Sequence, residues 1–157
     1  MITKPLNILL ADDDSDDRFF FKEVLKDINI ATKLTTAADG EQLMLLLNDP
    51  LCALPDVLFL DLNMPRKNGF ECLAEIKQVA RLKSIPIVIF STSFEQEVVS
   101  MLYKNGAHYF IRKPSEFTQL KKIVQMTVLL FLHKEIVKPS EENFVLYLEN
   151  NTPEWAP

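Results

Sequence analysis

Several side chains that could carry out chemistry stand at the ends of short hydrophobic runs in this chain. Asp12 and Asp13 follow the first run, Asp61 follows a second, Ser91 follows a third and Lys113 follows the last. Carboxylates that lie close together repel one another near neutral pH, and such a cluster is typical of a divalent-cation site, where hard oxygen ligands suit Mg²⁺. A lysine, a hydroxyl and a cation could together neutralise a phosphoryl group on a carboxylate.

The runs that precede these side chains have the pattern of buried strands. Residues 8–11, 57–60 and 87–90 are continuously apolar, which is typical of strands covered on both faces in a parallel sheet. In an open parallel sheet the carboxyl ends of the strands border a single crevice. A parallel sheet would therefore bring the candidate side chains together.

The intervening segments have the spacing of amphipathic helices. The first begins near Ser15, which we expect to be its N-cap, and Asp16 and Asp17 fall in the first turn, outside the candidate site. A weaker strand is expected at 32–37 and a last short strand at 108–111, before a long helix that begins at Ser115 or Glu116. The order predicts an α/β fold of five strand-helix repeats with right-handed crossovers.

Composition excludes several classes of protein. With 157 residues, 48% of them apolar, the chain is expected to form one globular domain, and its net charge of −5 argues against nucleic-acid binding. The amino terminus resembles neither a signal peptide nor a membrane span, so we expect a cytoplasmic protein that does not bind membranes. Cys52 and Cys72 lack metal-ligand spacing and are expected to be reduced.

Four motifs in the expected order resemble the receiver domain of two-component response regulators. They are Asp12-Asp13, Asp61-Leu62-Asn63-Met64-Pro65 with Gly69, Ser91, and Lys113-Pro114. Each motif alone is weak, but their joint occurrence is specific, and the resemblance runs from Leu6 to about Lys134. It implies a flavodoxin-like (βα)5 fold, a doubly wound five-stranded parallel sheet with strand order 2-1-3-4-5, which is the order known for the chemotaxis receiver.

The resemblance also implies roles at the acidic site. Asp61 would be the phosphoacceptor, and Asp12 and Asp13 would bind Mg²⁺, with Asp13 as the direct ligand. Asp61 itself and the backbone carbonyl of Asn63 would complete the protein's ligands to the metal.

Three further positions match switch and catalytic residues of the family. Lys113 would contact the phosphoryl group, and its bond to Pro114 is expected to be cis. Ser91 would move toward the phosphoryl group, and Phe110 stands where many members have a switch tyrosine. A phenyl ring can move inward but has no hydroxyl.

The function implied by the resemblance is that of a bacterial, stand-alone response regulator rather than a conventional enzyme. It would accept a phosphoryl group from a sensor histidine kinase or a phosphotransfer protein, assist its own phosphorylation and dephosphorylation, and signal by binding an unknown protein target. We expect a receiver domain at 1–137 and a tail at 138–157 without an output domain. The apolar last helix would pack against the island at 144–148 or form a homodimer.

An enzyme remains the alternative. Asp12-x-Asp14-Ser15 after a strand resembles the nucleophile motif of haloacid-dehalogenase-type phosphatases, with Asp12 as nucleophile. Against it, no acidic pair at a further strand end follows Lys113, and Asp61 would have no role.

Overall fold

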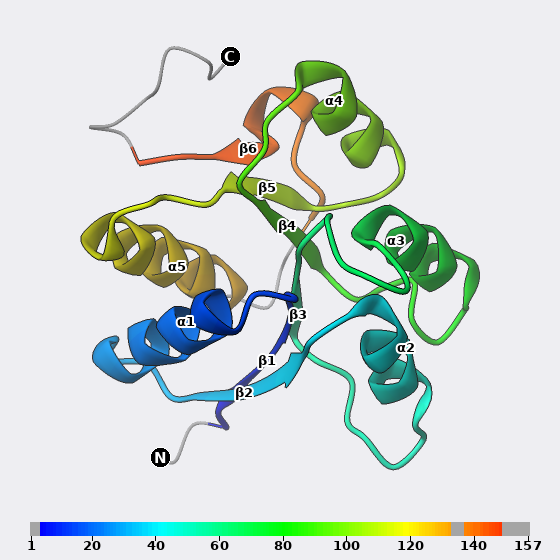
Figure 1. Cartoon of the computed structure of the whole chain (residues 1–157), viewed down its shortest axis with the longest axis horizontal. Coiled ribbons are helices and arrows are strands. Elements are labelled where there is room, and N and C mark those ends of the chain that lie inside the picture. Colours follow the sequence, from blue (N-terminus) through cyan, green and yellow to red (C-terminus); the bar gives the residue numbers. More distant parts are fainter. Residues whose placement is uncertain (1–3, 133–136, 149–157) are drawn as a thin grey trace.

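The computed structural model describes residues 4–132 and 137–148, which form alternating strands and helices (Figure 1). The elements are β1 (Leu6–Ala11), α1 (Ser15–Asp27), β2 (Thr32–Ala37), α2 (Gly40–Asn48), β3 (Val57–Leu60), α3 (Gly69–Gln78), β4 (Ile87–Ser91), α4 (Gln96–Lys104), β5 (Tyr109–Arg112), α5 (Phe117–Leu132), the 3-10 helix η1 (Glu141–Asn143) and β6 (Val145–Leu146). All neighbouring strands are parallel, in the order β2-β1-β3-β4-β5-β6. The predicted fold and strand order are confirmed, and a sixth strand extends the sheet.

The sheet separates two hydrophobic cores. Helices α1 and α5 cover one face, and α2, α3 and α4 cover the other (Figure 1). Strand β3 lies at the centre with all four side chains fully buried. Val57 and Phe59 face α1 and α5, whereas Leu58 and Leu60 face the other core, which explains why this run is apolar without alternation.

The structure corrects two of the predicted helix starts. Asp14, not Ser15, caps α1, because its side chain accepts hydrogen bonds from the backbone N–H groups of Asp16 and Asp17. Ser15 is the first helical residue instead. The last helix begins at Phe117 rather than at Ser115 or Glu116. An aspartate and a serine are similarly good N-caps, so their order in the sequence alone does not decide the start.

The segment from Pro139 to Leu148, here called the C-terminal arm, packs against β5 and α4. Phe144 is buried, and its ring lies 5.3 Å from that of Tyr103 and 6.4 Å from that of Phe110. The Phe110 N–H donates to the Phe144 carbonyl at 3.0 Å, and the Tyr103 hydroxyl donates to the Pro139 carbonyl at 2.8 Å. The predicted apolar island therefore packs within its own domain.

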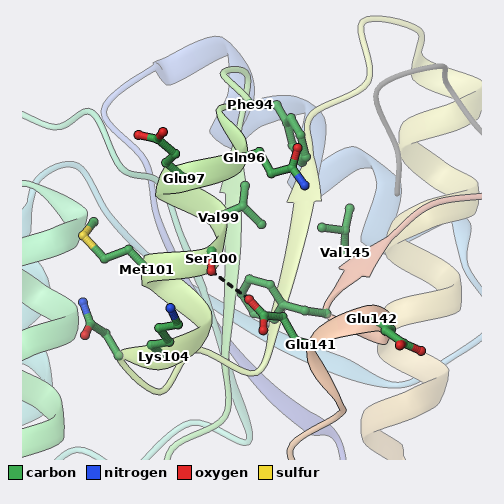
Figure 2. A pocket seen from close by; sticks show the side chains of 12 residues that line it. Phe94, Gln96, Glu97, Val99, Ser100, Met101, Lys104, Glu141, Glu142 and Val145 are labelled. Atoms are coloured by element: carbon green, nitrogen blue, oxygen red, sulfur yellow. Dashed lines mark hydrogen bonds between the residues drawn. The ribbon is translucent and has the colours of Figure 1, made fainter.

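A groove of about 800 Å³ lies between α4 and the C-terminal arm (Figure 2). Ser100 on α4 donates a hydrogen bond of 2.8 Å to Glu141 of the arm, and this bond crosses the groove. Val99 and Val145 contribute apolar side chains to its lining, and Glu142 stands at the arm side. The arm therefore forms one wall of this groove.

Helix α5 has an inner and an outer apolar face. Val124 and Phe131 are buried with the α1 side of the sheet, and the partly buried Leu146 of β6 packs against the same core. The outer residues Leu129 and Leu130 are 44% and 39% exposed. The tail thus contacts this core, while the outer face of α5 stays uncovered among the described residues.

His108 precedes β5 and gives the fold a predictable response to acid. Its Nδ1 accepts the backbone N–H of Ile87 at 3.2 Å, and burial, together with Lys77 and Lys138, lowers its pKa to about 4. In the unfolded chain a histidine has its ordinary pKa near 6.5. As the pH falls below 6.5 the unfolded state takes up the proton first, so the folded state loses stability progressively until the pH reaches about 4.

We expect His108 to account for a loss on the order of 2 kcal/mol between pH 7 and pH 5. His108→Asn keeps an oxygen that can accept the Ile87 N–H and removes the titration. Urea unfolding at the two pH values should show a loss smaller by that amount in His108→Asn than in the wild type. Equal losses in the two proteins would contradict the assignment.

Candidate metal and acceptor site

The predicted side chains meet at the carboxyl edge of the sheet. Asp12 directly follows β1, Asp61 directly follows β3, Ser91 ends β4 and Lys113 directly follows β5. The Asp61 N–H donates to the Ala11 carbonyl at 3.0 Å, and the Lys113 N–H donates to the Ser91 carbonyl at 2.8 Å. These bonds continue the ladder past the strand ends, so the backbones that carry the site are held by the sheet.

Three carboxylates form a cluster that fits a divalent cation. One oxygen from each of Asp12, Asp13 and Asp61 lies within 4.8 Å of the others. Asp12 and Asp61 are buried and Asp13 is exposed, so the cluster opens to solvent on one side. Carboxylate oxygens at this spacing are ligands that Mg²⁺, Mn²⁺ or Ca²⁺ would accept.

Lys113 supplies the cluster's buried positive charge. Its Nζ lies 2.6 Å from Asp12 Oδ2, 3.0 Å from Asp17 Oδ2 and 3.8 Å from Asp61 Oδ2. Burial opposes the charged form of this side chain, but the surrounding carboxylates together raise the pKa of Lys113. Lys113 therefore carries a proton at neutral pH.

One lysine does not neutralise the acids around it. Burial, with repulsion from Asp12 and Asp13, raises the pKa of Asp61 to about 7 despite the attraction of Lys113. Burial also raises the pKa of Asp12. A cation at this position would relieve the repulsion and favour the ionised form of Asp61.

The loop after Asp61 depends on Gly69 and on a contact that the sequence did not reveal. A Cβ on Gly69 would lie 2.2 Å from the Asp61 carbonyl oxygen, so only glycine allows this close approach. Arg66, at a positive φ of 66°, pairs with Asp39, the N-cap of α2, at 2.9 Å. Asn63 is exposed in this loop, and the metal role of its carbonyl stays a prediction.

The two predicted switch residues lie on adjacent strands. Ser91 is buried, and its hydroxyl lies 3.2 Å from that of Ser93. Phe110 on β5 is buried between the rings of Phe94, at 5.7 Å, and Phe144. Their movement on phosphorylation stays a prediction.

Two sequence-based expectations at the site are wrong. Asp17 does not lie outside the site, because the first turn of α1 brings its carboxylate to Lys113. The bond between Lys113 and Pro114 is trans, since the described residues contain no cis peptide bond. The trans form is the intrinsically preferred one, by roughly 0.5–1 kcal/mol before proline.

Comparisons with known proteins identify matching families and structures. The family model for the response regulator receiver domain matches residues 8–125. Response regulator Rcp1 of Synechocystis sp. is 37% identical over 128 residues, which cover 77% of this chain and 85% of Rcp1. The two-component response regulator ARR17 of Arabidopsis thaliana is 31% identical over 127 residues, which cover 75% of this chain and 82% of ARR17.

Solved structures agree with these matches. The crystal structure of the Mn(2+)-bound form of Rcp1 superposes with a TM-score of 0.74 at 34% identity, covering 87% of this chain and 100% of the other. That of the phosphorylated cyanobacterial phytochrome response regulator RcpA gives a TM-score of 0.77 at 31% identity, with the same coverage. These relatives support two-component signalling and give no support to the haloacid-dehalogenase alternative. Each helix within residues 4–132 and 137–148 is too short or too polar to cross a bilayer.

Proposed function

This chain belongs to the response regulator receiver family, and from that membership we propose that Asp61 accepts a phosphoryl group from a phosphohistidine of a histidine kinase or a phosphotransfer protein. The observation that carries the proposal is the meeting of Asp12, Asp13 and Asp61 with Lys113 at one edge of the sheet. Asp61 is the carboxylate for which the phosphatase alternative has no role.

The proposed reaction transfers one phosphoryl group between two side chains. An ionised oxygen of Asp61 attacks the phosphorus, the phosphorus–nitrogen bond of the phosphohistidine breaks, and its electron pair returns to the imidazole. Lys113 donates a hydrogen bond to one phosphoryl oxygen, and the Ser91 hydroxyl donates to another. Water later hydrolyses the acyl phosphate, which resets the switch.

Mg²⁺ is the cation we propose for this reaction, held by Asp12, Asp13, Asp61 and the backbone carbonyl of Asn63. When bound, it would neutralise charge on the phosphoryl oxygens. The three clustered carboxylates support a hard divalent ion in general. The Mn(2+)-bound form of Rcp1 shows that this relative binds such an ion.

An aromatic surface beside the crevice is our candidate for the docking site of the phosphodonor protein. Phe19, Phe20 and Phe117 are 56%, 45% and 39% exposed, and the rings of Phe20 and Phe117 lie 6.4 Å apart. A recess of about 270 Å³ connects Phe20 and Phe117 to Lys113. Exposed aromatic side chains next to a reaction centre are typical of protein-binding surfaces.

Output is proposed to occur by partner binding on the side of α4, β5 and the C-terminal arm. Phosphorylation would draw Ser91 toward the site and let Phe110 repack, and Phe110 contacts the arm through Phe144. A homodimer would use the outer face of α5, where Leu129 and Leu130 are exposed.

Phosphorylation of the purified protein tests the proposal. Incubation with acetyl phosphate and Mg²⁺ should add a single phosphoryl group, which mass spectrometry after borohydride trapping should locate on Asp61. EDTA should prevent the modification, because charge neutralisation by the cation is then lost. Size-exclusion chromatography of the purified protein, with and without beryllofluoride, reports whether the oligomeric state changes.

Two results would overturn the proposal. One is a phosphoryl group on another residue, or equal modification with and without a divalent cation. The other is steady turnover of p-nitrophenyl phosphate that is lost in Asp12→Ala and kept in Asp61→Ala, which would favour the phosphatase.

A further inference from the structure

Three carboxylates lie close to the Lys113 ammonium group, but only two of them accept hydrogen bonds from it. Its Nζ donates hydrogen bonds to Asp12 at 2.6 Å and to Asp17 at 3.0 Å, whereas Asp61, at 3.8 Å, is too far for a hydrogen bond. The ammonium group is therefore held on the side of α1, and the proposed acceptor receives only its longer-range attraction.

Asp17 differs from the other two acids in its surroundings. It belongs to the first turn of α1, where Asp14 accepts its backbone N–H at 3.2 Å. Its side chain is 36% exposed, against 1% for Asp12 and 9% for Asp61. Asp17 also lies outside the cluster of carboxylates that fits a cation. Its side chain pairs with Lys113 among the described residues.

We propose that Asp17 is a positioning residue that holds Lys113 away from Asp61 and thereby weakens the site's hold on anionic groups. The inference rests on the proposed function, because it assumes that Lys113 must reach a phosphoryl group on Asp61. To do so, the ammonium group has to move from its place 3.8 Å from Asp61, and Asp17 holds it on the α1 side with a full negative charge.

The test measures how tightly the metal-loaded protein binds beryllofluoride, an anion that mimics a phosphoryl group on a carboxylate. Asp17→Asn keeps the shape of the side chain and an acceptor oxygen but removes the charge. We expect it to raise the beryllofluoride affinity about 3-fold to 10-fold in excess Mg²⁺, measured by fluorine NMR titration. The rate of phosphorylation by acetyl phosphate should rise by a similar factor.

Asp16→Asn is the matched control. Asp16 lies one residue earlier in the same helical turn, is exposed, and has no ion pair within the described part of the chain. It removes the same charge without touching Lys113, so we expect less than a 2-fold change. Asp17→Glu restores a carboxylate that can reach Lys113 and should return both measurements toward the wild-type values.

A second background tests whether the effect passes through Lys113. In Lys113→Ala, adding Asp17→Asn should change the phosphorylation rate no more than Asp16→Asn does. Equal effects of Asp16→Asn and Asp17→Asn in the wild-type background, or a loss of affinity in Asp17→Asn, would overturn the inference. If the wild type itself binds no beryllofluoride, the proposed function fails instead.

Discussion

Asp61→Asn is expected to accept no phosphoryl group from acetyl phosphate and, in metal-free buffer at pH 8, to be more stable than the wild type. An amide cannot act as the attacking oxygen, so the loss of modification should be complete. The gain in stability has a separate cause. Burial and the nearby acids raise the pKa of Asp61 to about 7, so its ionised form is disfavoured in the folded state.

The stability gain should depend on pH in a defined direction. In the unfolded chain the carboxyl group has its ordinary pKa of 3.8, so between pH 4 and 7 the unfolded state ionises first. The wild type therefore loses stability as the pH rises through this range, and the full cost is present above pH 7. Because Lys113 keeps its hydrogen bonds to Asp12 and Asp17 in the variant, we expect a net gain on the order of 2 kcal/mol at pH 8.

Urea unfolding with EDTA at pH 4, 6 and 8 measures the gain, and Asp16→Asn serves as the control for removal of one negative charge. Saturating Mg²⁺ should raise the stability of the wild type more than that of Asp61→Asn, because the variant lacks one proposed ligand. An Asp61→Asn protein that is less stable than the wild type at pH 8 without metal would show that the Asp61 carboxylate is not strained in the folded state.

The candidate site could be predicted because its residues lie at the ends of strands that the sequence marks strongly. The runs before Asp12, Asp61 and Ser91 are continuously apolar, and parallel strands must end on the same edge. The local pattern and the parallel topology were therefore sufficient to predict that these groups meet. The family resemblance supplied the strand order.

The contacts that the sequence did not predict join distant parts of the chain. Strand β6 has two residues, too few for a periodic pattern, and it pairs with β5 beside the contact between Phe144 and Phe110. The pair of Asp17 with Lys113 joins residues 96 positions apart, and that of Arg66 with Asp39 joins residues 27 positions apart. From the sequence alone, a charged residue in the first turn of a helix is expected to face solvent. Only the packing of that helix shows whether the side chain meets a partner.

Phe144→Ala is expected to destabilise the protein by about 3–4 kcal/mol, the usual cost of emptying a buried phenylalanine site. Phe144 is 1% exposed and packs edge-on against Tyr103, so truncation leaves a cavity between β5, α4 and the C-terminal arm. The arm is held by a short strand and few side-chain bonds, so it can detach when this side chain is removed. Urea unfolding at pH 7 measures the change, with Phe19→Ala, 56% exposed, as the matched control.

Hydrogen exchange distinguishes loss of the arm from general weakening of the sheet. The Phe110 N–H donates to the Phe144 carbonyl, so its exchange should speed up sharply in Phe144→Ala if the arm detaches. The Ile89 amide lies in β4 at the centre of the sheet, between β3 and β5, and should keep most of its protection. Equal destabilisation by Phe144→Ala and Phe19→Ala, with no change at Phe110, would show that the arm contributes no packing in solution. Protection of the Phe110 amide in the wild type would show that the arm is bonded to Phe110, the residue proposed to switch, in solution. Any inward movement of Phe110 would then also disturb the arm.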